Sequence, residues 1–492
     1  MSLEHLPVVQ VVLPLLAAPL CLLLRHEKVV RWFAVGVAWV GLGIALQLLH
    51  TVQTEGAITY WLGGWAPPLG IELAIDSVNA FLLVIVSGMA AVVLPFGPGS
   101  ATLAIPQDRH HLFYAVFLLC LCGLLGISAT GDAFNVFVFL EVTSLSSYTM
   151  IALGKGRRAL MAAFSYLVMG TIGGTFILIG IGLLYQMTGT LNMADLAARL
   201  PAVIETRTVL VAFGFLTCGS SIKLAVFPLH QWLPNAYTHA PSMVSAFLAS
   251  TATKVSYYVL VRVLFGIFGA AFVFGTVKLH WLLLPASLLA MFFGSLAAIW
   301  QTDVKRLLAY SSIAQIGYMT LGLAMNSTTG LAGGLVHLFN HALSKGGLFL
   351  VVACVSWRVG SSKLEDMAGL GKRMPLTLLA FAIGGFSLIG VPGTAGFISK
   401  WYLVSAALEK GWIWLAVLIL LSSLLAVAYV FRVLEVAWFR EPPPGDVGIR
   451  EPPASMWIPA WILIGATILF GLWTDLTGDV AERAAALLMG VG

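Results

Sequence analysis

Five ionisable side chains fall inside long apolar stretches of the sequence: Glu141, Lys223, Lys254, Lys345 and Lys400. An unpaired charge at the centre of a membrane span costs about 2.5–3.5 kcal/mol, so the five together would cost roughly 15 kcal/mol. Such groups are kept only when they are paired, hydrated or neutral. Each of these states allows a side chain to exchange a proton, so the set predicts proton transfer inside a membrane.

Glu141 follows the mostly apolar run from Asn135 to Leu140, which places it within a span. Lys223 is its natural partner, because no other buried cation is obviously free. The alternative is a static ion pair, which would stabilise assembly and relay no protons.

His337, His341 and Lys345 are spaced four residues apart. On a helix this spacing places them along one stripe, which drifts by about 40° per step. Histidine is the side chain whose ordinary pKa lies closest to neutral pH, so two of them beside a lysine are typical of a proton wire. Histidines at this spacing can also bind zinc. Since no acidic third ligand is near in the sequence, we predict no metal.

Hydroxyl groups surround Lys254 between Ser250 and Ser256. They can hold the water that a relay needs between side chains. His230 and His239 flank a short loop and are candidate gates for proton entry from the cytoplasm. Ordinary interfacial histidines are the alternative interpretation.

The composition requires lipid as the main solvent. Of the 492 residues, 60% are hydrophobic and 10% are charged, whereas a soluble domain has about 25% charged residues. The net charge of +5 is scattered over short loops, which argues against a nucleic-acid surface. The five cysteines lie in apolar runs without iron–sulfur, haem or zinc spacing, so we predict no cofactor in this chain.

Apolar runs of the ~20 residues needed to cross a bilayer recur along the chain. We predict an all-α polytopic membrane protein with about fourteen transmembrane helices. They lie near 6–24, 30–50, 77–96, 111–130, 133–153, 159–186, 208–229, 241–265, 280–300, 305–325, 330–356, 375–408, 411–438 and 456–475.

Two of these spans contain glycine and proline beside a lysine, and we predict that both are broken. One has Pro228 near Lys223, and the other has Pro392 near Lys400. Interrupted helices at matching places in two halves are the usual sequence pointer to a transporter site. A simple proline kink is the alternative for either helix alone.

Basic loop residues orient the protein. Fifteen of the 26 Lys and Arg residues lie in alternate loops, and five lie in the loops of the other side. The larger set is therefore predicted to be cytoplasmic and both termini to face outward. The fifteen are Arg25, Lys28, Arg31, Arg109, Lys155, Arg157, Arg158, Lys305, Arg306, Arg358, Lys363, Lys372, Arg373, Arg440 and Arg450.

Three further charges inside spans have other expected roles. Arg262 is expected to snorkel from a helix end towards water. Arg432 and Glu435 are three residues apart and could pair on one helix face, in a structural or exit-side role.

Three motifs in order resemble the antiporter-like proton-translocating family. They are KLAVFPLHQWLPNAYTHAPS (223–242), DVKRLLAYSSIAQIGY (303–318) and NHALSK (340–345). The family includes Mrp antiporter subunits and the pumping subunits of respiratory complex I and membrane-bound hydrogenases. The resemblance covers roughly residues 75–435. The chain is most similar to the Mrp-type group for three reasons. It has a lysine at 400, it has the NHALSK pattern, and it leaves no room for a lateral helix after the last span.

The resemblance implies two inverted five-helix repeats at 111–265 and 280–438, each with one broken helix. Residues 1–110 would form three preceding helices, and 439–492 a loop and a final helix. The resemblance also assigns roles: Lys223 and Lys400 as the broken-helix lysines, Glu141 as the acid of the fifth helix, Lys254 as the bridging lysine, and His341 and Lys345 as the central relay. Gln315 departs from relatives that have histidine there, so a relay through that helix would need water.

The implied function is proton translocation in a multisubunit Na⁺/H⁺ antiporter of a bacterial cytoplasmic membrane. The chain would then be a secondary transporter subunit rather than an enzyme, with other hydrophobic antiporter subunits as partners. One alternative places the same relay in a redox-driven complex, either NADH–quinone oxidoreductase or a hydrogenase. Another is a structural membrane scaffold with frozen ion pairs.

Overall fold

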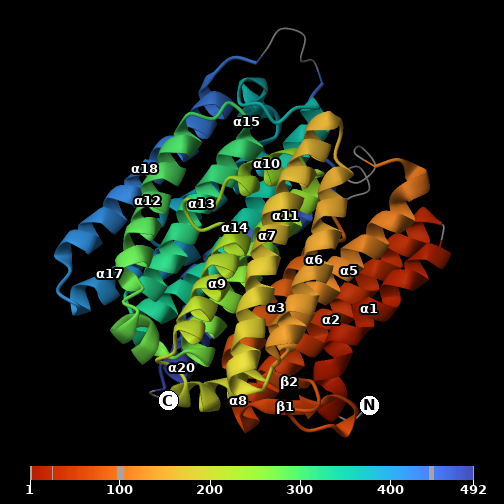
Figure 1. The fold of residues 1–492 in the computed structure, drawn as a ribbon. Coiled ribbons are helices and arrows are strands. Elements are labelled where there is room, and N and C mark those ends of the chain that lie inside the picture. The colour runs from red at the N-terminus through yellow and green to blue at the C-terminus, as the bar shows by residue number, and fades with distance from the viewer. Residues whose placement is uncertain (1–2, 25, 97–104, 443–447, 491–492) are drawn as a thin grey trace.

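The computed structural model describes residues 3–24, 26–96, 105–442 and 448–490, and they form a bundle of long helices (Figure 1). Arg25, one of the basic loop residues above, lies outside the described residues. Within the described part, twelve helices are long and apolar enough to cross a membrane, or thirteen if the bent pair Glu365–Arg373 and Pro375–Ile389 is one span. The predicted all-α polytopic fold is confirmed.

Each predicted span corresponds to one helix or to one broken pair. The first half contains α1 (Leu6–Leu23), α2 (Glu27–Glu55), α3 (Ser77–Val93), α5 (His110–Ala129), α6 (Ala133–Ala152), α7 (Arg157–Thr188), α9 (Arg207–Leu224), α10 (Trp232–His239) and α11 (Ser242–Val261). The second half contains α12 (His280–Ile299), α13 (Val304–Ala324), α14 (Thr328–Val359), α16 (Pro375–Ile389), α17 (Ala395–Glu409), α18 (Ile413–Phe439) and α19 (Ala454–Leu472).

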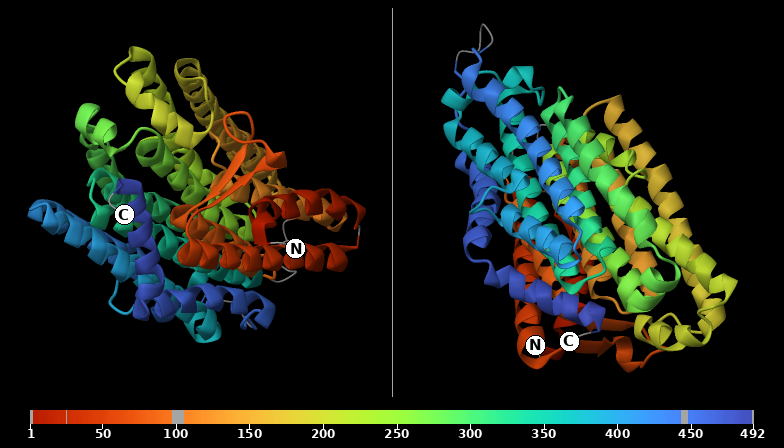
Figure 2. Two further views of the ribbon diagram at one scale, coloured as in Figure 1. Left: turned by 90° about the horizontal axis from the view of Figure 1, so that it is seen from below. Right: turned by 90° about the vertical axis from the view of Figure 1, so that its left-hand side faces the viewer.

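Short elements cover the two ends of the bundle. At one end lie the hairpin of β1 (Ile58–Trp61) and β2 (Glu72–Ile75), helix α8 (Met193–Arg199) and both chain ends (Figures 1 and 2). The strands pair antiparallel from Ile58 with Ile75 to Trp61 with Glu72. We name this the hairpin end. The opposite end, with α10 and α15 (Leu370–Arg373), is the α10 end.

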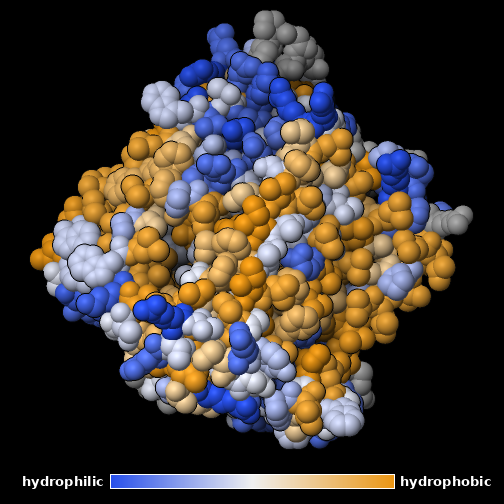
Figure 3. Space-filling view, viewed as in Figure 1, coloured by the Kyte–Doolittle hydropathy of each residue, from blue (hydrophilic) through white to orange (hydrophobic). Residues whose placement is uncertain are grey.

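An apolar belt separates these ends. Figure 3 shows hydrophobic side chains across the middle of one face and hydrophilic ones gathered towards both ends. Exposed apolar residues such as Phe164 on α7 and Leu424 on α18 would be unfavourable in water but suit contact with lipid.

Helix α14 lies inside the bundle and is shielded from that belt. Its residues 330–355 are all buried, and it packs against α11, α13, α16, α17 and α19. The ionisable side chains between residues 330 and 355 are therefore shielded from lipid.

Both predicted helix breaks are present. Helix α9 ends at Leu224, where Ala225 adopts a left-handed conformation with φ 63°, and α10 begins at Trp232. Helix α16 ends before Gly390, whose φ is 89°, and α17 begins at Ala395. Pro228 and Pro392, which lack an N–H donor, lie within the two interruptions. Each interruption leaves backbone carbonyl groups free inside the bundle.

Candidate functional site

Glu141 on α6 and Lys223 on α9 meet as the sequence predicts. The Lys223 Nζ lies 3.6 Å from the Glu141 Oε1 and donates a hydrogen bond of 2.7 Å to the Ser144 hydroxyl. The lysine side chain is 4% exposed and that of Glu141 is 30% exposed, so the acid is the more accessible partner.

A glycine on the neighbouring helix α7 makes room for this pair. A Cβ atom on Gly174 would overlap the Glu141 carboxylate and would lie 3.8 Å from the Lys223 Nζ. The close approach of the three helices therefore depends on the absence of a side chain at this position.

The broken end of α9, beside Lys223, is held by an aromatic side chain of α10. The Trp232 indole N–H donates to the Ile222 carbonyl at 3.0 Å. Its ring stacks on Tyr166 of α7, with centroids 3.9 Å apart. This tryptophan thus ties α10 to the broken end of α9, where the Ile222 carbonyl also accepts from the Ala225 N–H, and it packs against α7.

Lys254 on α11 is fully buried and has no carboxylate among its described partners. Its Nζ donates to the Ala249 carbonyl at 2.5 Å and lies 3.4 Å from the Thr253 hydroxyl. Two neutral acceptors leave part of the hydrogen-bonding capacity of an ammonium group unused. This position therefore suits a lysine that releases its proton.

His337 and His341 lie one turn apart on α14 with their rings stacked, the centroids 6.3 Å apart. The His337 Nδ1 is 2.9 Å from the Ser399 hydroxyl of α17. Neither ring nitrogen of His341 has a hydrogen-bond partner among the described residues, although both are buried. Buried polar atoms without protein partners are normally hydrated, so water is expected beside His341.

Lys345 continues the same face of α14 and points to α13. Its Nζ donates to the Leu308 carbonyl at 2.8 Å and makes a short hydrogen bond to the Ser311 hydroxyl. Helix α11, which carries Lys254, packs directly on α14, which carries His341 and Lys345. The structure thus places the predicted bridging lysine and the predicted central relay residues on neighbouring helices.

Lys400 on α17 reaches back to the broken end of α16. Its Nζ donates to the carbonyls of Leu388 and Ile389 at 3.0 and 2.8 Å and to the Ser423 hydroxyl of α18 at 2.8 Å. Three acceptors match the three donors of an ammonium group, and a helix C-terminus favours a positive charge. The Tyr318 ring adds a cation–π contact at 4.7 Å. This position is therefore built to hold a protonated lysine.

The two candidate entry histidines lie in different surroundings. His230 is buried and stacks on Phe227, and its Nδ1 has no described partner. His239 lines a cavity of about 350 Å³ together with Lys155, Lys305 and Ser362. That cavity gathers basic loop residues at the α10 end, as the charge pattern predicts.

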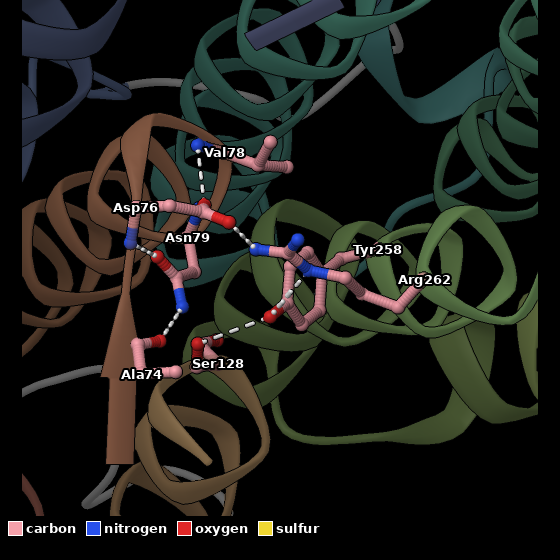
Figure 4. Close-up of polar contacts among 7 residues, drawn as sticks. All are labelled: Ala74, Asp76, Val78, Asn79, Ser128, Tyr258 and Arg262. Atoms are coloured by element: carbon pink, nitrogen blue, oxygen red, sulfur yellow. Dashed lines mark hydrogen bonds and ion pairs between the residues drawn. The ribbon is translucent and has the colours of Figure 1, made fainter. Parts of the chain in front are cut away.

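The two arginines expected inside spans have partners that the sequence did not identify, and one expected pair is wrong. Arg262, at the end of α11, pairs with Asp76, which precedes α3, at 2.5 Å (Figure 4). Arg432 does not pair with Glu435, because it donates to the backbone carbonyls of Ile299 and Gln301, while Glu435 binds Arg440. Both partners come from parts of the chain that sequence spacing on one helix cannot identify.

Several hydroxyl groups of the site were not singled out from the sequence: Ser144, Ser311, Ser399 and Ser423. Each contacts one of the predicted relay residues, a lysine or a histidine, from a neighbouring helix. A serine in an apolar span is a usable signal, but it does not reveal which cation it serves.

Known proteins resemble the chain over nearly its whole length. Residues 130–426 match the family described as NADH:quinone oxidoreductase/Mrp antiporter, TM. NADH-quinone oxidoreductase subunit N of Desulforudis audaxviator (strain MP104C) is 44% identical, with 96% of each chain covered. A Na(+)/H(+) antiporter subunit of Bacillus subtilis (strain 168) is 30% identical, with 98% of this chain and 97% of the relative covered.

The fold is also found in a solved assembly. A chain in the structure of the Mrp complex from Dietzia sp. DQ12-45-1b superposes with a TM-score of 0.90 at 27% identity, covering 99% of this chain and 98% of that one.

Proposed function

Because the chain belongs to the NADH:quinone oxidoreductase/Mrp antiporter family, we propose that it is the proton-translocating subunit of a multisubunit Na⁺/H⁺ (monovalent cation/proton) antiporter. The observation that carries the proposal is the set of buried amines and imidazoles on α9, α11, α14 and α17. Glu141 is the one carboxylate among the predicted relay residues, and it serves Lys223. If the buried amines kept a permanent charge, they would need more opposite charge around them than one carboxylate provides.

The proposed route follows the hydrogen-bonding capacity of the lysines. A proton enters near Lys223, whose protonation Glu141 controls, and passes to Lys254. From there it crosses through water at His341 to Lys345 and reaches Lys400. Lys254 has too few acceptors to keep an ammonium group, while Lys400 has three, so the proton has a resting place at the far end.

Two inverted repeats would carry this route, at residues 111–265 and 280–438, flanked by 1–110 and 439–492. The similar lengths of α7 and α14, 32 residues each and each followed by a broken span, support this division. The basic α10 end would face the cytoplasm of a bacterial cell, and both termini would face outward. The other subunits of the antiporter would be its partners, and the subunit would act as a secondary transporter with no cofactor of its own.

Replacing Lys223 or Glu141 by alanine tests the proposal. In the purified complex reconstituted into liposomes, either variant should abolish cation-driven proton movement, followed with a pH-sensitive dye, and the complex should still assemble. Full activity of either variant would overturn the proposal. A Lys400→Met variant that impairs assembly while the proton flux per assembled complex stays normal would favour a structural scaffold instead.

A redox-driven complex is the second candidate, favoured by the 44% identity to a subunit named for NADH–quinone oxidoreductase. The relay would be the same, and only the source of energy would differ. Purification of the tagged protein in mild detergent, with mass spectrometry of its partners, separates the two. Small hydrophobic antiporter subunits would support the antiporter, whereas flavin or iron–sulfur subunits would place the chain in a redox-driven pump.

A further inference from the structure

The hairpin end of α11 holds a polar cluster outside the proposed route (Figure 4). The Arg262 guanidinium binds the Asp76 carboxylate at 2.5 Å, and its Nε donates to the Tyr258 hydroxyl at 3.1 Å. Tyr258 in turn donates to the Ser128 carbonyl of α5 at 3.3 Å. Lys254, Tyr258 and Arg262 follow one another at four-residue spacing, so the cluster continues the helix face that carries the bridging lysine.

A cavity of about 210 Å³ adjoins this cluster. Its wall includes Glu72, Asp76, Thr130, Tyr258 and Arg262. Glu72 uses one carboxylate oxygen to accept from Asn192 at 2.6 Å. A space of this size with several polar groups holds a number of water molecules, since one water needs about 10–15 Å³.

The other side of Tyr258 and Arg262 is apolar. There the two residues border a space of about 20 Å³, which is lined by aliphatic side chains such as Ile177, Ile181 and Leu216. It has room for about one water molecule and few polar partners for it, so it is expected to stay dry. This side of Tyr258 and Arg262 therefore offers water no route past the two residues.

We propose that the cavity is a second, outward port for protons, and that Arg262, Tyr258 and Asp76 form its gate. This inference rests on the proposed function. With the ion pair closed, Lys254 is sealed from the cavity. When the pair separates, water enters, the Lys254 ammonium gives its proton to that water, and a neutral amine and a hydronium ion result. The first half of the protein then has its own exit, and the crossing to Lys400 is bypassed.

Two features allow such a gate to move without unfolding its surroundings. Directly at Arg262 the helix changes to a π-helical turn, η5 (Arg262–Ile267), a feature that is frequent at functional sites. Asp76 is fixed independently of Arg262, because its other oxygen accepts from the backbone of Val78 and Asn79 as the N-cap of α3. The arginine is therefore the partner that can move without the loss of a helix cap.

Asp76→Asn is the sharpest variant, since asparagine caps a helix as well as aspartate but removes the charge that holds Arg262. We expect passive proton leak to rise several-fold in liposomes containing the complex, with neither a cation gradient nor a redox substrate. Arg262→Gln should do the same. Arg199→Gln is the matched control: it breaks the exposed pair with Asp195 at the same end, and the leak should stay at the wild-type rate.

The double variant Asp76→Asn with Lys254→Ala shows whether the leak uses the relay. The leak should fall back to the wild-type rate, and a leak that persists would overturn the proposal, as would an unchanged leak in Asp76→Asn. If Asp76→Asn does not assemble, Tyr258→Phe, which keeps the cap, decides by the same readout. Cation-driven transport by Lys223→Ala in the same liposomes reports separately on the proposed function, so the two failures are distinguishable.

Discussion

At the scale of single residues, the Glu141–Lys223 pair depends on a missing side chain. We predict that Gly174→Ala lowers transport several-fold, because the new Cβ atom would displace the Glu141 carboxylate from Lys223. The measurement is proton transport by the reconstituted complex.

The matched control is Gly182→Ala on the same helix, where a Cβ atom meets no atom within 4 Å. Both changes raise helix propensity by about 1 kcal/mol, so a difference between them isolates the contact with Glu141. Equal transport by the two variants would contradict the importance of the close approach.

His341 provides a second prediction at this scale. His341→Leu should abolish transport while leaving the thermal unfolding of the detergent-solubilised complex unchanged, because neither ring nitrogen has a described protein partner to lose. His337→Leu loses the contact with Ser399 and should also destabilise by about 1 kcal/mol. Normal transport by His341→Leu would exclude this residue from the relay.

The physics of burial explains which of these residues could be predicted from the sequence. A lysine or histidine in an apolar run is conspicuous, because lipid makes its charge costly. Glu141, Lys254 and Lys345 are indeed buried or partly buried inside the bundle. The acceptors are not conspicuous: Ser311 and the Leu308 carbonyl serve Lys345 only because α13 packs against α14.

At the scale of elements, the broken helix α9–α10 is held by Trp232. We predict that Trp232→Phe, which keeps a ring for stacking on Tyr166 but removes the indole N–H donor to Ile222, destabilises by about 1 kcal/mol and lowers transport. Thermal unfolding and proton transport check the two effects. Trp281→Phe on the surface of α12, where the residue is 75% exposed, should change neither. Unchanged transport by Trp232→Phe would mean that transport does not depend on the hydrogen bond from this indole to the Ile222 carbonyl.

The elements that the sequence did not predict are those at the bundle ends. The hairpin lies between the predicted spans 30–50 and 77–96 and is not recognisable from the sequence, because its strands have four residues each and show no clear alternation of apolar side chains. Helix α20 (Asp475–Met489) was also not predicted. This helix packs on α14 and α3, and its buried residues are small, such as Ala481 and Ala485. In the sequence alone, the same segment is too polar to be recognised as a membrane span. Tertiary contacts decide such short elements.

At the scale of the whole molecule, the orientation in the membrane can be tested directly with impermeant thiol reagents on intact cells. Leu69, between the two strands, is 86% exposed, and Leu69→Cys should be labelled from outside. Lys363, in a loop of the α10 end with a side chain 63% exposed, should be labelled after Lys363→Cys only when the cells are permeabilised. The five native cysteines give little background, since four are buried and Cys218 is only partly exposed.

The expected direction follows from the cost of moving basic loops across a membrane, which keeps lysine and arginine on the cytoplasmic side. Lys155, Lys305 and His239 share one cavity at the α10 end, so the whole basic face must stay on one side. Labelling of Lys363→Cys in intact cells, with protection of Leu69→Cys, would show that the protein has the opposite orientation in the membrane. The cavity beside Arg262 would then open to the cytoplasm, and the gate at Asp76 would control proton entry in place of exit.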